Sequence, residues 1–135
     1  MKNISVLIVN EKLDHKGIIS NTSFVIGLTA GRELAKETFG IDVVDGDGST
    51  HKCLTNIGHF VRKAGQNKIR TLRKEFLDQG IVVVDYTEDA APADYQSYTE
   101  SIKSHKGEEI IYRAIWIYGS ENIVFPKTKN LSSLQ

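Results

Sequence analysis

The sequence predicts an α/β fold: a three-layer α-β-α sandwich around a mixed, mostly parallel sheet of about four to five strands. Two observations carry this prediction. β-Prone apolar runs alternate along the chain with segments of helical periodicity, which is typical of a sheet covered by helices on both faces. The best runs, residues 4–9, 81–85 and 110–118, are apolar at successive positions, as in strands buried between two layers.

The chain begins with the strand of residues 4–9, followed by a polar turn. Residues 17–36 have a helical pattern. Three apolar side chains share one face of this expected helix: Phe24, Leu28 and Ala35. Because glycine costs about 1 kcal/mol inside a helix, Gly27 and Gly31 predict a close approach to a neighbouring layer.

The middle of the chain contains a weaker strand at residues 41–45, an Asp-Gly turn, and further extended segments at residues 51–53 and 57–62. Residues 66–79 form the clearest amphipathic helix, and Gly80 closes it. Its apolar stripe consists of Ile69, Leu72 and Phe76.

The next strand, residues 81–85, ends in a carboxylate, Asp85. Pro92 fits the first turn of the helix that follows, and Gly107 ends that helix. The shared face of the helix carries Tyr95, Tyr98 and Ile102.

Residues 110–118 predict an interior strand with two apolar faces. The aromatic face holds Tyr112, Trp116 and Tyr118, and the other face holds Ile111, Ile115 and Ile117. Trp116 is therefore expected to be buried, whereas Arg113 on the isoleucine face needs a carboxylate partner or an exit to solvent. A short helix at residues 120–125, stopped by Pro126, and an extended tail complete the chain.

The bulk composition predicts a single globular domain over residues 1–135. Lys and Arg number 17, and so do Asp and Glu, so the zero net charge argues against electrostatic capture of nucleic acid. The one cysteine, Cys53, cannot form an internal disulfide and indicates a reducing compartment. No apolar run is long enough for a signal peptide or a membrane span, so we expect a cytoplasmic protein without a membrane partner.

Neither a metal nor a cofactor is expected. Residues 45–49 resemble a calcium loop, but the glycine and glutamate that an EF-hand requires are missing, which predicts a plain turn. The four histidines have no metal-ligand spacing: His15, His51, His59 and His105. His59, beside an apolar run, is most simply structural. The glycine-rich phosphate-binding motifs are also absent.

Ligands of α/β sheets bind at the carboxyl ends of strands. This rule directs attention to the loop that ends at Gly17 and to Asp85. Three roles remain open for Asp85: a general base, a group that orients a water or ligand, or a cap of the following segment. Glu88 and Asp89 are expected to point into solvent.

Residues 62–74 contain six basic and no acidic side chains. On a helix, Lys63, Arg70 and Lys74 would form one stripe opposite the apolar face. The stripe is either a phosphate-binding surface or, as we favour, a solvated polar face.

Ordered motifs along essentially the whole chain resemble the DUF2000 family. They are the opening run of residues 6–9 with Leu13, Gly17 and Asn21; residues 43–45 with their glycine turn; residues 83–85; Tyr95 and Tyr98; residues 117–119; and Thr128 with Leu131. This resemblance implies a fold similar to the archaeal and eukaryotic type of peptidyl-tRNA hydrolase, a mixed sheet sandwiched by helices.

The hydrolase pattern is only partly present. Its motif glycine corresponds to Gly17, but the catalytic lysine that follows is replaced by Ile18, and Lys16 precedes the glycine instead. Its strand-end aspartate matches Asp85. The two threonine positions of the pattern hold Asp89 and Ala114, with Thr87 merely nearby. The resemblance therefore implies the hydrolase scaffold without the full catalytic set.

Two hypotheses follow. The first, which we favour, is a binding or regulatory module whose cleft holds a small polar ligand or peptide end. Its expected ligand-binding residues are Lys16, Gly17, Asn21 and Thr87, together with Asp85. The alternative is a hydrolase of acyl or aminoacyl esters or amides in which Asp85 orients a water. An RNA partner is possible but not favoured, and the chain is a candidate homodimer.

Overall fold

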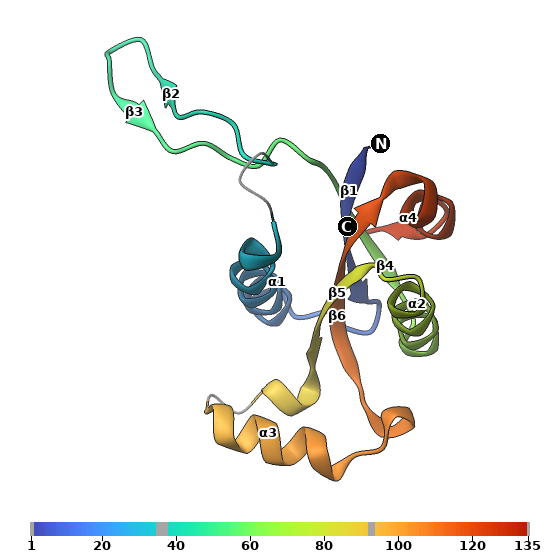
Figure 1. The fold of residues 1–135 in the computed structure, drawn as a ribbon. Coiled ribbons are helices and arrows are strands. Elements are labelled where there is room, and N and C mark those ends of the chain that lie inside the picture. Colours follow the sequence, from blue (N-terminus) through green and yellow to red (C-terminus); the bar gives the residue numbers. More distant parts are fainter. Residues whose placement is uncertain (1, 35–37, 92–93, 135) are drawn as a thin grey trace.

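The computed structural model describes residues 2–34, 38–91 and 94–134. Five strands form one mixed sheet in the order β5-β6-β1-β4-β7 (Figure 1). Their bounds are β1 (Asn3–Asn10), β4 (Gly58–Ala64), β5 (Val82–Thr87), β6 (Tyr112–Ser120) and β7 (Ser132–Ser133). These strands confirm the predicted number and the interior position of residues 110–118.

The expectation of a mostly parallel sheet is wrong. Within the described part of the chain, only β1 and β4 pair in parallel, whereas β6 runs antiparallel to both β1 and β5, and β7 runs antiparallel to β4. The reason is the connection between β5 and β6, which passes beyond the end of the sheet instead of crossing its face (Figure 1). A parallel return needs a crossover.

Helices cover both faces of the sheet, as predicted (Figure 1). Helix α1 (Lys16–Ala30) packs on β5 and β6, while α2 (Gln66–Asp78) and α4 (Glu121–Thr128) pack on the opposite face. The α2 core joins three helix residues to the strands: Ile69, Leu72 and Phe76, as the sequence predicted. The α1 core contains Ile26, Ala30, Tyr86, Ala114 and Trp116. Trp116 is 6% exposed, which confirms its predicted burial.

Helix α1 presents a different face from the predicted one. Phe24 and Leu28 are both 66% exposed, and Ala35 and Lys36 lie outside the described residues. The buried stripe runs instead through Thr22, Ile26 and Ala30, which repeat every four residues. A Cβ atom on Gly27 or Gly31 would meet open space, so the predicted close approach at these glycines is also wrong.

Strand β6 contains a bulge that reorders its aromatic face. Tyr86 pairs with Ala114 but Thr87 pairs with Tyr112, so Arg113 is an extra residue on β6. Because the extra residue inverts the alternation, Tyr112 joins the α2 core instead of sharing a face with Trp116. The Arg113 guanidinium meets Glu88 at 3.1 Å, which supplies the expected carboxylate partner.

Between α1 and β4 the chain extends into a separate two-stranded hairpin, β2 (Val43–Val44) and β3 (Thr50–His51), which projects from the rest of the molecule (Figure 1). The predicted strand of residues 41–45 is thus reduced to two residues outside the main sheet. Asp45 closes the turn by accepting hydrogen bonds from the Asp47 and Ser49 backbone N–H groups. This is the plain turn that the sequence predicts.

Helix α3 (Tyr95–Ser104) begins at Asp94, whose carboxylate accepts the Ser97 N–H at 2.7 Å, while Pro92 lies outside the described residues. The last helix, α4, extends to Thr128 with Pro126 inside it, so Pro126 does not stop this helix as predicted. No helix in residues 2–34, 38–91 or 94–134 has the length and apolarity needed to cross a membrane.

Candidate functional site

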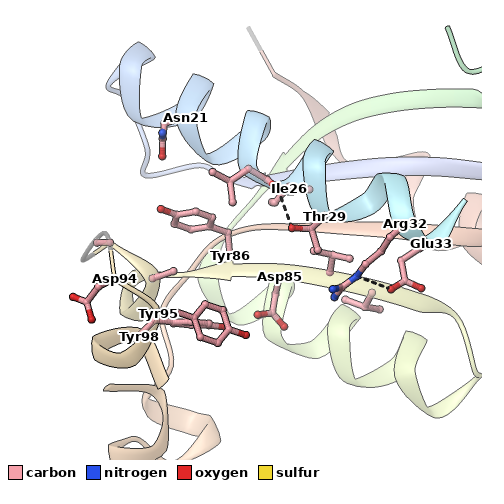
Figure 2. Close-up of a pocket in the computed structure, with 15 residues that line it drawn as sticks. Asn21, Ile26, Thr29, Arg32, Glu33, Asp85, Tyr86, Asp94, Tyr95 and Tyr98 are labelled. Atoms are coloured by element: carbon pink, nitrogen blue, oxygen red, sulfur yellow. Dashed lines mark hydrogen bonds and ion pairs between the residues drawn. The ribbon is translucent and has the colours of Figure 1, made fainter. Parts of the chain in front are cut away.

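The candidate site is a cavity of about 710 Å³ between α1, β5 and the start of α3 (Figure 2). Its size is typical of ligand pockets. Fifteen residues line it: Asn21, Val25, Ile26, Thr29, Arg32, Glu33, Val83, Val84, Asp85, Tyr86, Ala90, Ala91, Asp94, Tyr95 and Tyr98. Helix α1 thus contributes two apolar and two polar side chains, whereas β5 and the start of α3 contribute the three tyrosines and two of the carboxylates.

Strand β5 lies at the centre of the cavity, where it contributes four consecutive residues, from Val83 to Tyr86. Successive side chains of a strand point to opposite faces. Figure 2 shows the consequence: Tyr86 points to the side of α1, and Asp85 points to the side of Tyr95 and Tyr98. The two walls of the cavity therefore differ in chemistry.

Asp85 is held by an ion pair with Arg73 of α2, whose Nε lies 2.8 Å from the carboxylate. Burial acts to lower the Arg73 pKa, but the hydrogen bond and charge of Asp85 outweigh burial and raise that pKa above its usual value. Arg73 also lies over the Tyr112 ring, 5.9 Å from its centroid. Asp85 is thus an oriented carboxylate at the wall of the cavity.

Two tyrosines of α3 form an edge-to-face pair beside this carboxylate, with ring centroids 5.5 Å apart. Tyr98 lies on the inner side and Tyr95 is largely exposed. Burial, and then the negative charge of Asp85, raises the pKa of Tyr98. The charge of Asp85 therefore acts on Tyr98, although Arg73 is paired with the same carboxylate.

The charged residues of the lining are three carboxylates and one cation. Arg32 and Glu33 pair with each other at 3.4 Å at the surface. Asp94 caps α3, and the Ser97 backbone N–H lowers the pKa of this carboxyl. Among the described residues of the lining, Glu33 is thus paired with Arg32 and Asp85 with Arg73, and Asp94 is the carboxylate without an ion pair.

The structure brings together only some of the sequence-predicted site residues. Asn21 and Asp85 both line the cavity. Lys16 and Gly17 lie in the exposed first turn of α1, outside the lining. Thr87 is 1% exposed and its hydroxyl donates to Asp89, so it faces the interior of the protein.

A buried polar cluster at the end of β5 was not predicted from the sequence. The Asp89 side chain is only 4% exposed, which corrects the expectation that it points into solvent. It accepts hydrogen bonds from Ser101 Oγ at 2.6 Å and from Thr87 Oγ1 at 3.3 Å, and it pairs with His105 Nδ1 at 2.7 Å. We call these four residues the Asp89 cluster.

The Asp89 cluster links the C-terminal end of α3 to the end of β5. Burial acts to raise the Asp89 pKa, but the bonds from Ser101 and His105 outweigh it and lower that pKa. One signal in the sequence could have pointed to the cluster: Ser101 and His105 are four residues apart and would share a face of the helix predicted to end at Gly107, although in the structure α3 ends at Ser104. Glu88, the neighbouring acid, is the partly exposed partner of Arg113.

The basic stripe expected at Lys63, Arg70 and Lys74 does not form. Lys63 lies on β4 instead of on a helix, and Arg70 donates to the carbonyls of Glu108 and Ile110 at 2.9 and 2.8 Å. None of the three residues lines the cavity. A phosphate-binding surface therefore gains no support from this region.

No group of three or more His, Cys, Asp or Glu side chains is placed to hold a metal ion anywhere in the described ranges of the chain. His59, the histidine noted in the sequence, is exposed, and its Nδ1 contacts the Ile57 carbonyl at 3.2 Å. This contact is local and structural.

No curated protein matches the chain. Among solved structures, it is similar to a protein of unknown function, Atu0240, from Agrobacterium tumefaciens strain C58, with 16% sequence identity and a TM-score of 0.82. That match covers 100% of this chain and 99% of the other, and at this identity it shows a shared fold. The family model described as "Protein of unknown function (DUF2000)" matches residues 4–135, so the chain belongs to the DUF2000 family.

Proposed function

We propose that this protein is a ligand-binding module and that its cavity beside β5 takes a small organic cation. One observation carries the proposal: the described lining gathers three tyrosines and three carboxylates against a single arginine, Arg32, which pairs with Glu33, while Arg73 from outside the lining pairs with one oxygen of Asp85. The tyrosines are Tyr86, Tyr95 and Tyr98.

Aromatic rings attract cations through the negative faces of their π systems, by about 0.5–2 kcal/mol each depending on desolvation. Tyr98 and Asp85 both line the cavity and lie on the same side of β5 (Figure 2), so both can act on one ligand. The apolar wall of Val25 and Ile26 would cover the hydrocarbon part of such a ligand. Asn21 adds a side-chain donor and acceptor at the rim.

The alternative, a hydrolase in which Asp85 orients a water, has weaker support. Arg73 holds one oxygen of the carboxylate, Ile18 stands at the catalytic-lysine position, and Lys16 lies outside the lining. Ester hydrolysis needs groups that position the nucleophile and stabilise the developing charge. The similarity of the fold to peptidyl-tRNA hydrolases remains a prediction from the sequence.

The test is an NMR titration with benzylamine and its neutral counterpart, benzyl alcohol. We expect benzylamine to shift the amide resonances of residues 83–86 and to bind about 10-fold more tightly than the alcohol. Tyr98→Phe should keep this preference because the ring remains, whereas Tyr98→Leu and Asp85→Asn should weaken it. Asp78→Asn, an exposed change at the end of α2, is the charge-matched control.

Equal binding of the two probes, or shifts confined to residues outside the lining, would contradict the proposal. Hydrolysis of peptidyl-tRNA that Asp85→Asn abolishes would favour the hydrolase alternative. A cytoplasmic location and a homodimeric state remain predictions that cell fractionation and sedimentation velocity would test.

A further inference from the structure

Strand β5 is an edge of the sheet. It pairs with β6 along one side and, within the described residues, with no strand along the other. An edge strand presents backbone N–H and C=O groups that can pair with another strand. The opposite edge of the sheet, β7, is only two residues long, whereas β5 has six residues. The long unpaired edge is thus the one inside the candidate site.

The composition of β5 makes this edge unusual. Proteins usually protect edges with charges, proline or short strands. The β5 sequence is Val-Val-Val-Asp-Tyr-Thr, and its single charge, Asp85, is paired with Arg73. The protection comes instead from α1 and α3, which stand on either side of the cavity (Figure 2).

A strand added to β5 would project its side chains alternately toward the two walls. On one side they would meet Val25, Ile26 and Thr29 of α1, and on the other side Asp85 and Tyr98 (Figure 2). The first wall suits apolar side chains. The second suits cations, because Arg73 binds one Asp85 oxygen and leaves the other without a hydrogen bond among the described residues, beside the Tyr98 ring.

We infer that the natural ligand is an extended peptide segment of alternating apolar and basic residues, which adds to β5 as a further strand. Backbone pairing would give affinity, and the two walls would give specificity, as in other strand-addition complexes. The inference rests on the proposed function, since the basic side chains are the cations that the cavity takes.

Charge complementarity favours such a peptide over a second copy of the chain. Two copies joined through their β5 strands would supply no additional cation to these walls, whereas the described lining of each copy already carries three carboxylates and one arginine. A peptide with lysines places opposite charges at these positions.

The test uses calorimetric titration of the full chain with the peptide acetyl-Val-Lys-Val-Lys-Val-amide. Two variants of the peptide carry N-methyl groups, one at the valines and the other at the lysines. Successive N–H groups of a strand point to opposite edges, and every second one points to the same edge. Each methylation pattern therefore removes the donors of one edge only. We expect one pattern to weaken binding by at least about 10-fold and the other to be tolerated.

The controls separate the two proposals. Acetyl-Val-Glu-Val-Glu-Val-amide should not bind, because its carboxylates oppose those of the cavity. Equal effects of the two methylation patterns would overturn strand addition, as would binding of benzylamine without binding of the peptide. Strand addition would also be overturned if the protein formed a dimer that prevented binding of the Val-Lys peptide and that the peptide did not dissociate. Failure of both benzylamine and the peptide would overturn the proposed function itself.

Discussion

Helices α2 and α3 are attached to the same sheet in different ways. Helix α2 inserts Ile69, Leu72 and Phe76 into the core, and each is at most 1% exposed. Helix α3 has no buried residue, and its Ser101 and the adjoining His105 hold it to the sheet through Asp89. Of these two helices, α2 contributes to the core, whereas α3 lines the candidate site opposite α1.

This difference has a physical consequence for the site. Apolar burial contributes to stability in proportion to the area removed from water, so α2 can leave the sheet only when the whole core is lost. A helix held by a few hydrogen bonds can open locally at a smaller cost. The α3 wall of the cavity can thus adjust to a ligand without loss of the fold.

The largest expected effect lies on the α2 side of the comparison. Phe76→Ala removes a fully buried ring and should lower the free energy of unfolding by about 3–5 kcal/mol. Leu77→Ala is the matched control on the same helix: its side chain is 44% exposed, so the loss should be below about 1 kcal/mol. Urea unfolding measures both. Similar midpoints for the two variants would show that α2 is not the stabilising helix.

A smaller and local effect is expected on the α3 side. Asp89→Ala removes the acceptor shared by Ser101, Thr87 and His105. Each lost hydrogen bond to a charged group costs about 1.5–3 kcal/mol before relaxation, so α3 should open more often. Hydrogen exchange should show α3 amides exchanging about 10- to 100-fold faster, while α2 amides keep their protection.

The control for this experiment is Glu100→Gln, which changes an exposed carboxylate on α3 that contacts only Gln96 among the contacts described. Faster exchange in α2 and α3 alike after Asp89→Ala would break the comparison, because it would mean that the two helices open as one unit.

The same contrast explains which features the sequence could predict. Strands β1, β5 and β6 and helix α2 follow from apolar patterns, because burial selects those residues directly. Helix α1 was assigned the wrong face, since Phe24 and Leu28 are apolar yet exposed. A pattern of hydrophobicity cannot distinguish a core face from an exposed apolar one.

The site was predicted less completely for a related reason. The rule that ligands bind at strand ends predicted Asp85, and Asn21 was expected beside it as a ligand-binding residue. The Asp89 cluster depends on contacts between residues up to 16 positions apart in the sequence, as in the pair of Asp89 and His105. The bulge at Arg113 depends on strand register. Both are tertiary features that local periodicity does not encode.

The smallest expected effect is a pH dependence of the protection of α3 amides against hydrogen exchange. The folded-state pKa of Asp89 is lowered, because the bonds from Ser101 and His105 outweigh the burial that acts to raise it. A carboxylate with a lowered pKa contributes stability that is fully present above its unfolded pKa, which is about 4. That stability is lost as the pH falls through the folded-state pKa. We therefore expect the C-terminal half of α3 to lose protection against hydrogen exchange below a pH of about 4, while α2 keeps it.

Asp94 is a second acid whose protonation affects α3. It caps the other end of the helix, and the Ser97 backbone N–H lowers the pKa of its carboxyl. Its protonation should loosen the first turn, so the measurement compares amides of residues 101–104 with those of residues 97–98. Asp89→Asn supplies the decisive control, since the amide does not titrate in this range. If the variant and the wild type show the same loss of protection at residues 101–104 on acidification, then Asp89 is not the group that holds the C-terminal half of α3 to the sheet.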